Sequence, residues 1–218
     1  MEIVVFGAGD IARLARHYFT RDSEHTVVAF TVDGSYRTAD RFLDLPLIDF
    51  EHVTDRFPPD RYGMFVAMSY AKMNHVRAEK YQRARTLGYQ LVSYVSSKCT
   101  WLTDEPHGDN CFILEDNTIQ PFVSIGNDVT LWSGNHIGHD STIGDHCFVT
   151  SHVVVSGNVR VGAHCFIGVN ATLRNSITIA PETLIGAGAI IMADTKPQSA
   201  FVAGGTEVFP RPSGRIKL

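Results

Sequence analysis

A six-residue repeat fills the second half of the chain and limits its fold more than any other feature. From residue 113 onward an aliphatic residue recurs at every sixth position without a break, and a run of this length lies far outside chance. The repeated positions are Ile113, Ile119, Ile125, Leu131, Ile137, Ile143, Val149, Val155, Val161, Ile167, Leu173, Ile179, Ile185 and Ile191.

A period of six is the repeat of the hexapeptide parallel β-helix, in which three hexapeptides form one triangular coil of about 18 residues. The repeated aliphatic side chain points inward and stacks on its equivalents in the neighbouring coils. Glycine often follows it, as at residues 126, 138, 144, 162, 168 and 186, and glycine, asparagine and aspartate adopt the backbone conformations that corners need. The sequence therefore predicts a left-handed parallel β-helix with a C-terminal cap over residues 98–218.

The first part of the chain follows a different pattern, in which apolar runs alternate with helical ones. We expect strands at residues 3–6, 27–32, 64–68 and 91–95, and helices at about 10–19 and 72–87. Alternation of this kind predicts a small parallel α/β sheet. Residues 7–12 fit the G-x-G-x-x-G/A pattern between a strand and a helix. Because only about half of a two-lobed dinucleotide fold is present, we expect an α/β Rossmann-like half-domain over residues 1–97.

Composition excludes several classes of protein. The chain of 218 residues is 44% hydrophobic with a formal net charge of -4, which argues against a nucleic-acid partner. No apolar run is long enough to cross a bilayer, and no signal peptide is recognisable, so we expect a cytoplasmic protein without membrane insertion. The cysteines form no CxxC pair and are expected to be buried free thiols, with no metal bound. They are Cys99, Cys111, Cys147 and Cys165.

Two stretches of the repeat region resemble a known family. They are His136–Asp145 and Ser156–Gly162, and the likeness extends to Phe6–Asp10 and to the strand that ends at Asp33. In these stretches the chain is similar to bacterial sialic acid O-acetyltransferases and nucleotide-amino-sugar N-acetyltransferases. The repeat is shared by many acyltransferases, whereas its combination with the glycine-rich front part is more selective. The resemblance implies an acetyl-CoA-dependent N-acetyltransferase of a nucleotide-linked amino sugar in bacterial surface glycan synthesis, assembled as a homotrimer.

The resemblance implies that His139 is the catalytic base and that the acidic residue after it, Asp140, orients it. The chemistry agrees, because an amine that attacks a thioester must lose a proton and a neutral imidazole can accept it. A carboxylate beside the ring holds one tautomer. Other histidines of the repeat, at positions 136, 146, 152 and 164, are expected at corners or subunit interfaces.

One coil beyond His139 comes Gly157, and the next coil brings Asn175 to the same corner. A glycine there would let the arm of acetyl-CoA approach the backbone, and its N–H could bond the thioester oxygen. The family has a second histidine near the coenzyme, nine residues after the first. That position is Phe148 here, and His146 or His152 are candidates to replace it; we expect His146 among the acetyl-CoA contacts.

The front part is expected to hold the nucleotide sugar. Gly7 and Gly9 would let a phosphate meet the helix that begins near Asp10. Asp33, at the end of the second strand, stands where an acidic residue commonly takes a ribose hydroxyl. Ser69 follows the third strand, where the chain would close over the nucleotide.

Four alternatives remain open on the sequence alone. The acceptor could be a hydroxyl, which gives a sialic-acid-type O-acetyltransferase with the same base. The glycine-rich loop could be purely structural or belong to an NAD-binding protein. The β-helix could be a non-enzymatic or metal-binding trimer, as in carbonic-anhydrase-like proteins, if three histidines converge between subunits. Trp132 and Phe122 are candidate contacts of a subunit interface or of the acceptor sugar.

Overall fold

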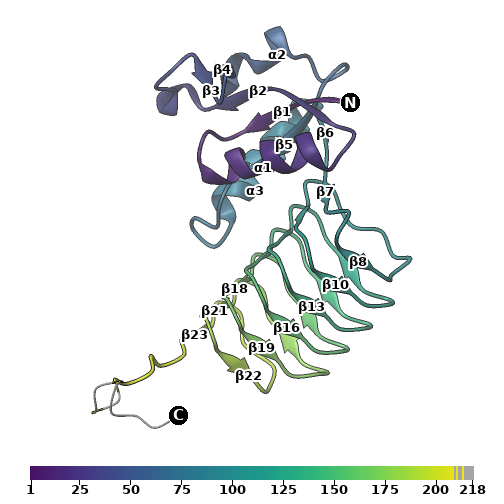
Figure 1. Cartoon of the computed structure of the whole chain (residues 1–218), viewed down its shortest axis with the longest axis vertical. Coiled ribbons are helices and arrows are strands. Elements are labelled where there is room, and N and C mark those ends of the chain that lie inside the picture. The colour runs from purple at the N-terminus through teal and green to yellow at the C-terminus, as the bar shows by residue number, and fades with distance from the viewer. Residues whose placement is uncertain (209, 211–212, 214–218) are drawn as a thin grey trace.

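The N-terminal apolar runs pair into one sheet in the order β3-β4-β2-β1-β5-β6. All neighbours are parallel except the pair of β3 with β4. The computed structural model describes residues 1–208, 210 and 213, and Figure 1 shows this sheet with its helices above the coils. The elements are β1 (Glu2–Phe6), α1 (Asp10–Arg21), β2 (Thr26–Val32), η1 (Gly34–Tyr36), β3 (Arg41–Phe42), β4 (Leu45–Asp49), η2 (Phe50–His52), α2 (Val53–Arg56), β5 (Gly63–Val66), α3 (His75–Thr86) and β6 (Gln90–Leu91).

Alternate residues of β1 face two different layers, as the period of two in a strand requires. Ile3 and Val5 pack with buried residues of α1, whereas Val4 and Phe6 pack on the other face with buried residues of α2 and α3. All four side chains are buried. The sheet is therefore covered on both faces, which is why its central strands read as continuous apolar runs.

The hexapeptide region winds into coils whose parallel sheets and repeat fit a left-handed parallel β-helix, as predicted. Each full coil contributes one short strand to each of three faces, and each strand pairs with its equivalent 18 positions away, as Ile137 does with Val155, except at the last strand, where Ile185 pairs with Phe201. One face contains β8 (Thr100–Trp101), β10 (Thr118–Ile119), β13 (His136–Ile137), β16 (Val154–Val155), β19 (Thr172–Leu173) and β22 (Ile190–Ile191). The second contains β11 (Ser124–Ile125), β14 (Thr142–Ile143), β17 (Arg160–Val161) and β20 (Thr178–Ile179).

The third face, which we call the covered face, lies beneath the α/β part. It contains β7 (Tyr94–Val95), β9 (Phe112–Ile113), β12 (Thr130–Leu131), β15 (Phe148–Val149), β18 (Phe166–Ile167), β21 (Leu184–Ile185) and β23 (Ala200–Phe201). The outward-pointing side chains of Phe112 and Phe148 are buried there, whereas Val154 and Ile190 on the first face remain exposed. The aromatic outward positions thus mark the face on which the α/β part packs.

The prediction of one continuous strand over residues 91–95 is wrong. The structure divides it into β6, which pairs with β5 in the α/β sheet, and β7, which pairs with β9 in the first coil. Apolar composition is the same in both sheets, so the sequence pattern did not reveal the change of sheet. The β3–β4 hairpin and the short helix α2 were also not predicted.

Helix α3 runs along the edge where the second face meets the covered face, and it contacts successive coils. The Tyr81 hydroxyl donates to Asp109, and the Arg77 guanidinium bonds both carboxylate oxygens of Asp128 at 3.0 Å. Asn74, just before the helix, donates to the His164 carbonyl oxygen at 3.3 Å. The Arg77 guanidinium also donates to the His146 carbonyl oxygen at 3.0 Å, so the side chains of α3 bind several neighbouring coils together.

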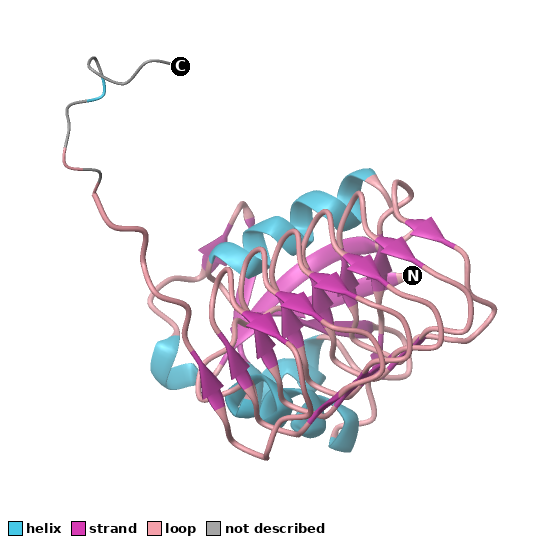
Figure 2. Cartoon of the chain, turned by 90° about the horizontal axis from the view of Figure 1, so that it is seen from below, coloured by secondary structure: helices cyan, strands magenta, loops and turns pink. Residues whose placement is uncertain are grey.

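The end of α3 and the end of the chain were both predicted, and only the second differs. Gly88, with φ of 88°, follows α3 in the left-handed conformation that ends helices, as predicted. The C-terminal tail was expected to cap the last coil. Instead residues 202–208 run away from the coils, with Val202 and Val208 exposed (Figure 2). The tail positions 209, 211–212 and 214–218 lie outside the described residues.

Candidate functional site

The predicted catalytic pair lies at a corner between the first and second faces of the β-helix, where residues 138–141 join β13 to β14. Nδ1 of His139 is 2.8 Å from a carboxylate oxygen of Asp140, and the two side chains are 56% and 49% exposed. Asp140 has φ of 58°, a conformation that aspartate tolerates and that turns its carboxylate beside the ring. With Nδ1–H donating to this carboxylate, Nε2 is left with a free lone pair. The pair can therefore accept a proton at Nε2.

The ring of His139 lies against the next coil at Gly157. A Cβ placed on this glycine would come within 2.6 Å of Nε2 and 2.8 Å of Cε1 of the imidazole, so only glycine leaves room for the ring. The backbone of the corner is fixed from the coil before, because the Gln120 side-chain oxygen accepts the His139 N–H at 2.9 Å. Gln120 and Gly157 thus fix the corner from both neighbouring coils, and sequence reasoning did not find Gln120.

Asn175 lies on the same edge, one coil beyond Gly157, as the spacing predicted. The Ser176 N–H donates to the Gly157 carbonyl at 3.0 Å, and the Asn158 N–H donates to the His139 carbonyl at 2.8 Å. Asn175 is exposed and bonds only the neighbouring Ser176 hydroxyl, at 3.4 Å, within the described residues. The three predicted residues of this edge therefore form one exposed column.

The histidines considered as replacements for Phe148 lie on other edges. His146 faces α3, with its Nδ1 2.9 Å from Asp128, and its ring lies 4.8 Å from that of His164. His152 lies at the edge between the covered and first faces, against Gly134. Phe148 itself is 2% exposed, with the Arg77 guanidinium 5.6 Å from its ring centroid. The structure thus does not bring His146 or His152 to His139, and position 148 is part of the packing between the two parts.

The residues predicted to hold a nucleotide sugar meet in one cleft of about 860 Å³ at the carboxyl ends of β1, β2 and β5. Gly7, Gly9, Asp10, Asp33 and Ser69 all line it. At Gly7, with φ of 127°, a Cβ would lie 2.6 Å from the Ala67 carbonyl oxygen, so the glycine is required by the approach of the β1–α1 turn to β5.

Helix α3 contributes side chains to this cleft that the sequence did not reveal. The Lys80 ammonium lies 2.9 Å from Asp33, and the Arg83 guanidinium lies 3.3 Å from the same carboxylate. Lys72 and Glu79 also line the cleft. The sequence did not indicate that this charged helix faces the cleft, and the Lys80 side chain is only 7% exposed. The cleft therefore combines backbone N–H groups at the start of α1 with cationic side chains, a combination suited to phosphate groups.

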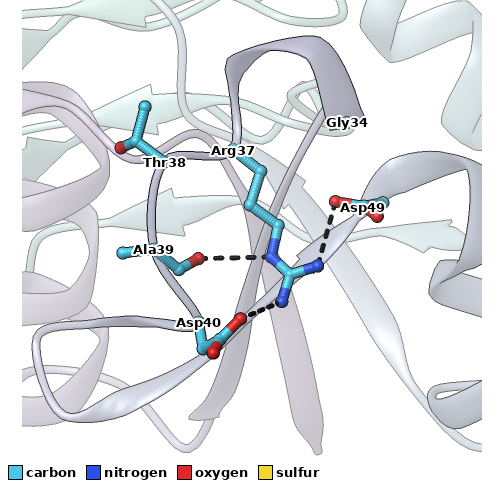
Figure 3. A pocket seen from close by; sticks show the side chains of 6 residues that line it. All are labelled: Gly34, Arg37, Thr38, Ala39, Asp40 and Asp49. Carbon is cyan, nitrogen blue, oxygen red and sulfur yellow. Dashed lines mark hydrogen bonds and ion pairs between the residues drawn. The ribbon is translucent and has the colours of Figure 1, made fainter.

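A second, smaller hollow of about 400 Å³ is formed by the segment after β2 and by Asp49 at the end of β4. Its lining includes Gly34 and Thr38 (Figure 3). Arg37 crosses it, bonding Asp49 at 3.3 Å and the Ala39 carbonyl at 3.2 Å, and it also pairs with Asp40. These bonds hold the segment after β2 in place.

The two candidate sites lie apart within one chain. The α/β part, which holds the cleft, packs on the covered face (Figure 1). His139 lies between β13 and β14, on the edge between the other two faces. Among the described residues there is no group of three or more histidine, cysteine, aspartate or glutamate side chains arranged to hold a metal ion. The helices of the described part of the chain include none that is both long and apolar enough to span a membrane.

Comparison with known proteins supports the fold. The family model described as bacterial transferase hexapeptide (six repeats) matches residues 122–157. No curated protein matches the sequence significantly. The acetyltransferase domain of PglB from Neisseria gonorrhoeae FA1090 is 18% identical, with a TM-score of 0.80 over 93% of this chain and 96% of that chain.

Two further solved structures are similar over most of both chains. A histidine variant of perosamine N-acetyltransferase from Caulobacter crescentus, in complex with CoA and GDP-perosamine, is 22% identical, with a TM-score of 0.82 over 93% of this chain and 94% of that one. WeeI from Acinetobacter baumannii AYE is 17% identical, with a TM-score of 0.65 over 87% and 96%. At these identities the likeness establishes a shared fold, including the order of an α/β part followed by a β-helix.

Proposed function

We propose that this chain is an acetyl-CoA-dependent N-acetyltransferase that acts on a nucleotide-linked amino sugar in bacterial surface glycan synthesis. The observation that carries the proposal is the His139–Asp140 pair, seated on a glycine of the next coil within a hexapeptide β-helix. The similar structures support it, since one is a perosamine N-acetyltransferase with CoA and GDP-perosamine and another is an acetyltransferase domain with acetyl coenzyme A.

In the proposed reaction His139 acts as general base. The amine nitrogen of the sugar attacks the thioester carbonyl carbon, and Nε2 takes the proton that the amine loses. Asp140 accepts the Nδ1–H bond, which fixes the tautomer and stabilises the imidazolium as it forms. Collapse of the intermediate breaks the carbon–sulfur bond, and the imidazolium returns the proton to the leaving thiolate. The products are the N-acetyl sugar and free CoA.

Acetyl-CoA is proposed to lie along the exposed column that Gly157 and Asn175 continue from His139. The Gly157 N–H has no hydrogen-bond partner among the described residues and is available to a thioester oxygen. His146, an acetyl-CoA candidate on sequence grounds, is already bonded to Asp128 on another edge, so the proposed path rests on the other two residues.

The nucleotide sugar is proposed to occupy the cleft of the α/β part, which we infer to be a Rossmann-like half-domain. Residues 1–97 would then bind the nucleotide sugar and residues 98–218 would carry out acetyl transfer, although β7 already pairs within the first coil. The pyrophosphate would meet Gly7, Gly9 and the start of α1. Lys80, beside Asp33, would supply a compensating charge.

We propose that the chain assembles as a homotrimer, and the separation of the cleft from the His139 corner supports this. The cleft lining does not include the His139 corner of the same chain, so in this proposal the acceptor amine reaches the His139 of a neighbouring copy. Cyclic assembly places equivalent sites between adjacent subunits, and three copies fit the three-sided cross-section. Val154 and Ile190 leave apolar surface exposed on a face that the α/β part does not cover.

The test is release of free thiol from acetyl-CoA with UDP-, GDP- and dTDP-linked amino sugars, by the wild type and His139→Ala. We expect turnover on one sugar and a loss of about 10²–10⁴-fold in the variant, as removal of a general base gives. His152→Ala is the matched control, because it removes a corner histidine of another edge, and it should retain full activity. Turnover that survives His139→Ala would contradict the assignment of the base. Turnover only on hydroxyl acceptors would make the enzyme an O-acetyltransferase.

A further inference from the structure

Phe122 stands out among the corner residues of the β-helix. Non-glycine residues with positive φ occur at corner positions from Asn110 to Gln198, and in the described part of these coils all except Phe122 are polar. Phe122 has φ of 65°, a conformation that is unfavourable for a bulky side chain and that asparagine or aspartate adopt at lower cost. Strain of this kind persists where the side chain serves a function.

Packing of the Phe122 ring inside the subunit does not offset this strain. It is 68% exposed, and it belongs to none of the hydrophobic clusters of the described residues. An apolar side chain that is both strained and solvated has no stabilising role within one chain. The reason for a phenylalanine at position 122 must therefore lie in what surrounds its exposed ring.

Phe122 lies directly next to the His139 corner, on the side opposite Gly157. Its predecessor Pro121 accepts the Asp140 N–H at 3.2 Å, and Gln120 accepts the His139 N–H at 2.9 Å. Position 122 is one coil before Asp140, since Ser124 pairs with Thr142. The His139–Asp140 corner thus has a bare glycine backbone in the next coil and an exposed aromatic residue in the coil before.

We propose that Phe122 contacts the acceptor, its ring packing against the apolar C–H face of the amino sugar while the amine points to His139. This inference rests on the proposed function and deepens it. Acetyl-CoA takes the side of Gly157, where the backbone is open, and the sugar takes the side of Phe122. An aromatic ring offers a flat apolar surface to a sugar ring whose hydroxyls project sideways, which orients the acceptor without a polar contact.

The test compares Phe122→Asn, Phe122→Tyr and Val169→Asn on the sugar that the wild type acetylates. Asparagine relieves the backbone strain, so the melting temperature of Phe122→Asn should be equal to or above that of the wild type. We expect its KM for the amino sugar to rise roughly three- to tenfold, with KM for acetyl-CoA unchanged. Tyrosine keeps the ring and should keep the wild-type KM. Val169→Asn removes an exposed apolar side chain from a different edge and should change neither constant.

Three outcomes would overturn the inference that Phe122 contacts the acceptor. An unchanged sugar KM in Phe122→Asn would show that the ring does not contact the acceptor, and the proposed function would stand. A change in the mass of the assembly by light scattering would assign Phe122 to a subunit interface instead. A wild type that acetylates none of the amino sugars would overturn the proposed function itself, and this inference with it.

Discussion

The substitution Gly157→Ala places one methyl group against the proposed base and leaves the rest of the chain unchanged. The new Cβ would lie 2.6 Å from Nε2, 2.8 Å from Cε1 and 3.1 Å from Cδ2 of His139. Comfortable contact between such atoms begins near 3.5 Å, so the imidazole must move by about 1 Å. Because the ring is more than half exposed, it can move outward without disturbing the core.

The magnitude follows from the sensitivity of proton transfer to position. A displacement of about 1 Å in a catalytic group costs roughly 10²-fold in rate, equivalent to about 2.7 kcal/mol of activation free energy. Stability should change by less than about 1 kcal/mol, because the φ of Gly157 is not positive and alanine can adopt its backbone conformation. We therefore expect kcat to fall about 100-fold while the melting temperature and the KM for the amino sugar stay near their wild-type values.

The assay is thiol release at saturating acetyl-CoA, paired with a thermal melt of the same preparation. Gly144→Ala is the matched control, since its Cβ would meet the backbone atoms Ala163 N at 2.8 Å and Gly162 C at 2.9 Å. These atoms cannot swing away, so that variant should lose stability. Wild-type kcat in a stable Gly157→Ala protein would refute the claim that the glycine positions the base. A stability loss as large as that of Gly144→Ala would refute the claim that the imidazole is the group that yields.

Two further predictions concern the contact between α3 and the coils. Arg77→Ala should lower the free energy of unfolding by about 3–5 kcal/mol, measured by urea titration, because it removes the charged partner of the buried Asp128 carboxylate and leaves that carboxylate only Asn110 and His146; a loss below about 1 kcal/mol would show that the pair contributes no more than a surface pair. Burial, and then the neighbouring charges of His146 and His75, lower the pKa of His164. The unfolded chain therefore binds a proton at His164 more readily than the folded chain does. The free energy of unfolding is highest above about pH 6.5 and decreases as the pH falls below it. His164→Asn, which suits the positive φ, should weaken this decline in melting temperature between about pH 8 and 5.5; an unchanged decline would exclude His164 as its source.

The β-helix was predictable from sequence because its core is built from one repeated contact. Every sixth side chain points inward, so Ile137 and its equivalents are buried wherever the period holds, and the spacing also places Gly157 beside His139. The cleft residues at Gly7 and Asp33 were predictable for a similar reason, since a local glycine pattern and a strand end determine them.

What the sequence did not reveal depends on contacts between the two parts. Arg77 is 1% exposed, yet in the sequence it belongs to a charged helix that resembles a solvated one. Its partners, the Asp128 carboxylate and the His146 carbonyl, come from coils more than 50 positions away. Phe148 was recognised as a departure from the family pattern, but its burial under Arg77 becomes visible only when the α/β part is docked on the covered face.

The parallel run of α3 and the coils restricts how a chain of this kind can vary in length. From Tyr81 to His75 the helix advances along coils whose corner residues run from Asp109 to Glu182. These side chains therefore reach several coils from a short stretch of the helix, and the contacts depend on the order of the corners between residues 109 and 182. Inserting or deleting one coil inside residues 109–182 would bring the α3 side chains on one side of the change opposite the wrong corner. Coils added after residue 182 meet no such constraint, so the β-helix is free to lengthen only at its far end.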